Sequence, residues 1–74
     1  MNTRAEYERI KARILELSYE RIRAEVAVEA NEDPSKVPEL EMKVKDLKEQ
    51  IKYNFKSMNN LFVRMTPEEI RSLD

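Results

Sequence analysis

The sequence predicts an all-α protein: an antiparallel helical hairpin with a short third C-terminal helix, assembling into a homo-oligomeric helical bundle. Three observations lead there, and the first two are a seven-residue apolar repeat in the second half of the chain and a proline-containing break at its middle. The third is composition, because the 74 residues are 41% hydrophobic and 39% charged and include no Gly. Such a composition favours extended amphipathic helices over a sheet, and the length suits one small domain.

The repeat predicts a helix over about 38–65. Its members alternate four and three residues apart, which places them on one side of a helix: Leu40, Val44, Leu47, Ile51, Asn54, Met58, Leu61 and Met65. Phe55 and Phe62 flank this line and widen it into a stripe. Asn54 is its one polar member and is expected to fix the register of packed helices, while a pocket that needs amides is the alternative.

The first helix is predicted over about 4–31 and carries two apolar stripes on nearly opposite faces. The first stripe contains Tyr7, Ile10, Ile14, Leu17, Ala24 and Val28. The second stripe contains Ala12, Leu15, Tyr19, Ile22, Val26 and Ala30. One partner helix can cover only one of these faces.

The two helices are predicted to join through a turn at 32–37. Pro34 and Pro38 disfavour helix at the residues before them, and Pro38 suits the first turn of the next helix. A connection of about 6 residues lets the second helix fold back along the first. Farther on, Thr66, Pro67 and Glu69 form a helix-start signal that predicts a short helix over 67–73.

Self-association is predicted because a domain of this size has little core and a lone hairpin leaves one stripe in water. With no Cys, disulfides cannot supply the missing stability. A dimeric four-helix bundle or a higher closed ring would cover the stripe. The residues expected at the oligomer interface are Tyr7, Ile10, Ile14, Leu15, Leu17, Ile22, Val26, Leu47, Ile51, Asn54, Phe55, Met58 and Phe62.

Charge and residue usage exclude several classes of function. Fourteen basic and fifteen acidic residues give a net charge of −1, so there is no global electrostatic reason to expect DNA as a partner. No apolar run approaches the roughly 20 residues of a membrane span, and no secretory signal is present, so a cytoplasmic protein without membrane contact is expected. No His or Cys is available, so we expect no enzyme activity, no metal and no cofactor.

Three features could bind a ligand. Arg21 stands in the middle of the first stripe, where we expect it to pair with a carboxylate of another helix, to lie at a seam position open to solvent, or to bind a ligand anion. Tyr19 could stack on a base, although Tyr at helical spacing is more often a sign of interface packing. A row of cations lines one side of the second helix, at Lys45, Lys48, Lys52 and Lys56, and Asn59 continues it. The row is either solvated or paired with Glu residues across the hairpin, or it is a phosphate-tracking strip.

One architectural resemblance bears on function. Ile51, Phe55, Met58, Leu61 and Phe62 precede Pro67 near the chain end. This arrangement resembles the later helix of small phage proteins that sequester cyclic nucleotide immune signals, the anti-CBASS and anti-Thoeris sponges. The resemblance implies a viral protein with ligand pockets between subunits, and Arg21, Tyr19 or the lysine row as candidate contacts.

The sequence therefore predicts a non-enzymatic, homo-oligomeric helical binding or assembly protein. Its partners are expected to be copies of itself and, beyond those, a small anionic nucleotide or another protein. Two alternatives stay open. One is nucleotide sequestration of the sponge type, and the other is a small RNA-binding helical hairpin.

Overall fold

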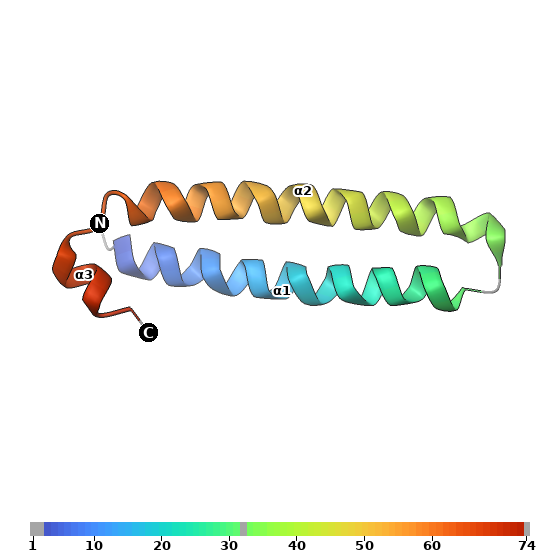
Figure 1. Ribbon diagram of the computed structural model, residues 1–74, viewed down its shortest axis with the longest axis horizontal. Helices are drawn as coiled ribbons and strands as arrows, with labels where there is room; N and C mark the ends of the chain where they lie inside the picture. Colours follow the sequence, from blue (N-terminus) through green and yellow to red (C-terminus); the bar gives the residue numbers. More distant parts are fainter. Residues whose placement is uncertain (1–2, 32, 74) are drawn as a thin grey trace.

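The computed structural model describes residues 3–31 and 33–73 and shows an all-α antiparallel hairpin (Figure 1). Helix α1 (Thr3–Ala30) and helix α2 (Val37–Phe62) lie side by side, joined through a short 3₁₀ helix, η1 (Pro34–Lys36). A third helix, α3 (Pro67–Arg71), follows at the open end of the hairpin. The predicted fold class is confirmed for the single chain. The molecule is a rod with extents of 52 × 18 × 15 Å.

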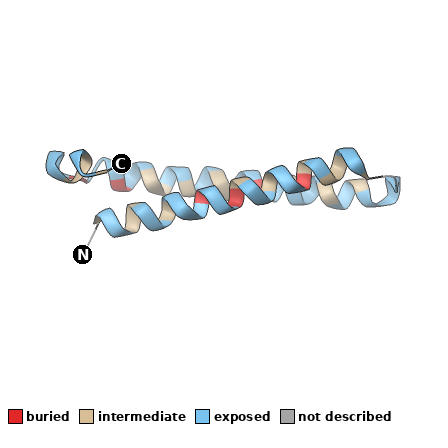
Figure 2. Ribbon diagram, turned by 90° about the horizontal axis from the view of Figure 1, so that it is seen from below, coloured by how far each residue is buried: buried red, intermediate tan, exposed pale blue. Residues whose placement is uncertain are grey.

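The core is a thin line of buried residues along the contact between α1 and α2 (Figure 2). The buried hydrophobic residues of the described chain are Ile14, Leu17, Ala24, Leu47, Leu61 and Met65. Leu17 is the deepest, with 1% of its surface exposed, and it clusters with Ala24 and Leu47. Burying an aliphatic side chain of this size contributes about 1.5–3 kcal/mol. Burial of a few large apolar side chains therefore provides much of the stability of the hairpin.

The predicted stripes form this seam. Every member of the apolar line from Leu40 to Met65 is buried or half-buried, and so is every member of the first stripe of α1. Val44 and Ile51 pack against the cluster around Leu17. Phe55 and Phe62, which flank the line, remain more exposed at 45% and 41%.

The connection follows the prediction at Pro34 but not before Pro38, because Val37 is helical, at φ −59° and ψ −46°. Asp33 is extended, at φ −100° and ψ 102°, as expected for a residue before proline. Its carboxylate then accepts hydrogen bonds from the Ser35 backbone N–H at 3.0 Å and the Ser35 hydroxyl at 2.7 Å. These bonds cap η1, which the sequence did not predict, and α2 begins at Val37, one residue before the predicted 38.

The first helix runs over Thr3–Ala30, one residue earlier at each end than the predicted 4–31. The predicted end of the second helix at 65 is wrong, because α2 stops at Phe62. Arg64 and Met65 donate their backbone N–H groups to carbonyls only three residues back, at 3.0 and 3.1 Å, which tightens the last turn. Thr66 must be extended to precede Pro67, so a continuous helix cannot reach it.

The helix-start signal at Thr66 is confirmed. Its hydroxyl accepts from the Glu69 N–H at 3.2 Å, and the Glu69 carboxylate accepts from the Thr66 N–H at 3.1 Å. Helix α3 ends at Arg71, two residues before the predicted 73, and Ile70 and Leu73 are half-buried. At the same open end the rings of Tyr7 and Phe62 lie with centroids 6.4 Å apart.

The Asp33 cap predicts a measurable pH response. The Ser35 hydroxyl, and then the Ser35 backbone N–H, lower the pKa of Asp33 below 3.8. The resulting stabilisation is present above the unfolded pKa and is lost as pH falls through the folded one. Replacing Ser35 by Ala should therefore raise the Asp33 pKa toward 3.8, as followed by carboxyl chemical shifts in a pH titration. Ser57→Ala is the matched control, and an unchanged Asp33 pKa in Ser35→Ala would contradict the cap.

Candidate functional site

The second stripe of α1 forms the outer face of the hairpin, and no other part of the described chain covers it. Leu15, Tyr19, Ile22 and Val26 are 58%, 61%, 49% and 57% exposed. Ala12 and Ala30 extend the line and are exposed as well. We call the row from Ala12 to Val26 the outer line. It lies on the side of α1 turned away from α2, because its residues are offset by about half a turn from the seam residues.

An open apolar groove of about 480 Å³ adjoins the outer line on one flank of the hairpin. Its apolar lining residues are Tyr7, Ala12, Ile14, Leu15, Phe55 and Met58, and its polar lining residues are Glu8, Lys11 and Ser18. Sequence reasoning missed this groove. The available signal was Phe55, which stands one residue off the apolar line and so projects beside the seam.

The residues predicted for the oligomer interface divide into three groups. Ile14, Leu17 and Leu47 are buried inside the chain's own seam, so they cannot reach a partner while the hairpin is closed. The half-buried group is Tyr7, Ile10, Ile51, Asn54 and Met58. The exposed group is Leu15, Ile22, Val26, Phe55 and Phe62. The surface left for a partner is thus mainly the outer line and the aromatic flank of α2.

Arg21 finds its partner on its own helix. Its Nη1 lies 3.1 Å from Glu25 Oε1, one turn farther along α1. The expectation of a carboxylate on another helix is wrong for this chain, because the four-residue spacing already brings Glu25 within reach. The contact between helices comes from Lys48, whose Nζ lies 3.9 Å from the same Glu25 oxygen.

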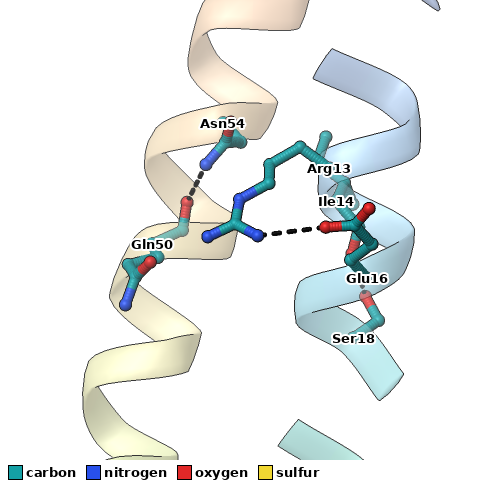
Figure 3. Close-up of polar contacts among 6 residues, drawn as sticks. All are labelled: Arg13, Ile14, Glu16, Ser18, Gln50 and Asn54. Atoms are coloured by element: carbon teal, nitrogen blue, oxygen red, sulfur yellow. Dashed lines mark hydrogen bonds and ion pairs between the residues drawn. The ribbon is translucent and has the colours of Figure 1, made fainter. Parts of the chain in front are cut away.

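Asn54 also turns to its own helix. Its Nδ2 donates to the Gln50 carbonyl oxygen at 2.7 Å (Figure 3). Ser18 does the same, since its hydroxyl donates to the Ile14 carbonyl oxygen at 2.8 Å. One N–H of the Asn54 amide is therefore used within α2.

The lysine row lies on the outer flank of α2, where Lys45, Lys48, Lys52, Lys56 and Asn59 are all exposed. The expected carboxylate across the hairpin is found for Lys48 alone among the described residues. Lys45, Lys52 and Lys56 have no ion-pair partner within residues 3–31 and 33–73.

The candidate ligand contacts converge only in part. Arg21 and Lys48, which belongs to the lysine row, both reach the same oxygen of Glu25, whereas Tyr19 stands on the outer line of α1. The described residues therefore offer two separate surfaces, one around Glu25 and one at Tyr19, in place of one polar pocket. Within the same part of the chain, no cluster of acidic side chains is placed to hold a metal ion.

Neither α1 nor α2 nor α3 contains an apolar stretch of the length needed to cross a bilayer. The fold and its surfaces define an all-α helical hairpin with an uncovered apolar face. No protein-family model, curated protein or solved structure matches the chain.

Arg21 gives a test of how its ion pair contributes to the seam. Its side chain is 32% exposed and stands between Leu17 and Ala24, so Arg21→Leu should extend the apolar seam and raise the free energy of unfolding by up to about 1 kcal/mol. Urea denaturation at fixed protein concentration measures the change. The control is Arg13→Leu on the exposed flank, expected to stay within about 0.5 kcal/mol. If Arg21→Leu instead lowers the free energy of unfolding, the ion pair of Arg21 with Glu25 stabilises the fold.

Proposed function

We propose that this chain is a non-enzymatic assembly module that associates with copies of itself through the outer line of α1. The observation that carries the proposal is the exposure of Leu15, Tyr19, Ile22 and Val26 in one row. Single exposed hydrophobic residues are ordinary, but a continuous row of large ones marks an interaction surface.

The surface area of the chain supports the same proposal. The single chain exposes 5934 Å², whereas a compact monomer of 8.8 kDa exposes about 4,800 Å². The excess of roughly 1,100 Å² exceeds the about 800 Å² that each partner buries in a standard interface. The elongated shape of the hairpin also gives a radius of gyration of 16.3 Å, whereas a compact chain of this length has about 11 Å. A second copy could therefore bury a full interface without any change in the hairpin.

Capture of a small anionic nucleotide finds less support. The groove beside Tyr7 and Phe55 has a largely apolar lining, and Arg21 is already paired with Glu25. A sponge would need cationic groups gathered around one pocket, which would have to be created by assembly.

Substitution on the outer line tests the assembly proposal. Ile22→Glu would place a charge in the interface, where an unpaired buried charge is costly, and should weaken association at least about 100-fold. Light scattering across a dilution series gives the mass. Ile22 is 49% exposed in the single chain, so helix content should not change.

Tyr53→Glu is the matched control, because Tyr53 is 71% exposed on α2 and lies outside the outer line. It should associate as the wild type does. A wild-type protein that stays monomeric at high micromolar concentration would overturn the proposal.

A second candidate function is binding of RNA along the lysine row. The observation that favours it is the lack of ion-pair partners for Lys45, Lys52 and Lys56 in the described chain, which leaves three cations free on one exposed flank. Rows of unpaired cations attract phosphates, and their affinity for nucleic acid falls with salt.

Lys52→Glu tests this candidate. If RNA binds the row, the substitution should reduce affinity about tenfold and should make the dependence of affinity on salt shallower. Fluorescence anisotropy with a labelled single-stranded RNA at several salt concentrations measures both. The control is Lys43→Glu, which lies off the row. Equal loss in both variants would indicate a non-specific charge effect.

A further inference from the structure

We infer that the outer line of α1 pairs with the same line of a second copy in the antiparallel direction, and that Glu16 and Arg23 select this arrangement. The inference rests on the proposed self-association and adds its direction and register. The occupant of the surface is a second copy of this chain.

The spacing of the outer line suits a helix of identical pattern. Its residues alternate three and four apart, as in the seam of a coiled coil: Ala12, Leu15, Tyr19, Ile22 and Val26. Two such lines in antiparallel contact place Leu15 opposite the partner's Val26 and Tyr19 opposite the partner's Ile22. Both contacts occur twice by the two-fold symmetry, so the large exposed side chains of the row all meet apolar partners.

The charges beside the line fit this register. Glu16 and Arg23 border the outer line on the same side, and each lies between the two apolar layers just described. In an antiparallel pair Glu16 therefore comes beside the partner's Arg23, again twice by symmetry. Arg23 is exposed and has no ion-pair partner among the described residues, whereas Glu16 uses one oxygen, Oε2, for Arg13 at 3.1 Å. The second carboxylate oxygen of Glu16 remains for the partner.

Other arrangements of the same two lines match less well. An antiparallel pair shifted by seven residues places Glu16 beside the partner's Glu16 and Arg9 beside the partner's Arg23, so like charges meet. It also opposes Val26 with the partner's Glu8.

A parallel pair gains Lys11 beside the partner's Glu16, but it places Arg4 beside the partner's Arg9. It leaves Arg23 beside the partner's Ser18. Arg23 thus contributes to association only in the unshifted antiparallel register.

Charge reversal distinguishes these arrangements. Glu16→Arg and Arg23→Glu, each alone, should weaken self-association about tenfold, because both symmetry-related pairs become repulsive. An equimolar mixture of the two variants should recover wild-type affinity as a heterodimer. In that heterodimer one copy carries two basic groups at these positions and the other carries two acidic groups, so opposite charges meet in both pairs. Glu20→Arg, off the line, is the control and should associate normally. Sedimentation velocity measures the affinities, and native mass spectrometry of chains of different mass identifies the heterodimer.

A distance measurement gives an independent readout. The chain has no Cys, so Arg9→Cys accepts a single spin label. The antiparallel register separates the two labels by about 35 Å along the axis, whereas a parallel pair places them within roughly 15 Å after allowance for helix spacing.

Two results have different consequences. A monomeric wild type would overturn self-association itself. A wild-type dimer with a short label distance, or with an Arg23→Glu variant that associates normally, would overturn the antiparallel register and leave self-association standing.

Discussion

A two-helix hairpin can bury only one face of each helix, and this constraint governs the whole molecule. Leu17 and Ala24 pack the inner face of α1 against Leu47 of α2, and the described chain has no further element to cover the outer face. The exposed row at Leu15 to Val26 is therefore a geometric consequence of the fold. The rod shape and the large surface follow from the same constraint.

The polar side chains near the seam find their hydrogen-bond partners within their own helix. Arg21, Asn54 and Ser18 each bond to their own helix, at a residue one turn away. Figure 3 shows Arg13 reaching toward α2 while it pairs with Glu16 of α1. Across the described hairpin, the ion pair that joins the two long helices is Lys48 with Glu25. Shape and apolar packing, more than polar contacts, hold the two helices together.

Periodicity was enough to predict the helices, the hairpin and the residues of the seam. Helix ends were harder, because Val63 to Met65 have helical spacing and only the extended Thr66 before Pro67 decides where α2 stops. The partner of Arg21 was mispredicted because a single sequence offers carboxylates on both helices, and side-chain reach decides between them. The groove was missed since it depends on the crossing of two helices, which no pattern within one helix encodes.

The connection between the helices also orders how the chain can fold. Asp33, Pro34 and Ser35 form a short link that holds the neighbouring ends of α1 and α2 close together, so contacts nearest the link close the smallest loops. Pairing that starts there and extends away from it meets the lowest entropic barrier at each step. The rings of Tyr7 and Phe62 join residues far apart in the chain and would close last. The contacts at the end of the rod that carries the groove thus close the largest loops of the hairpin.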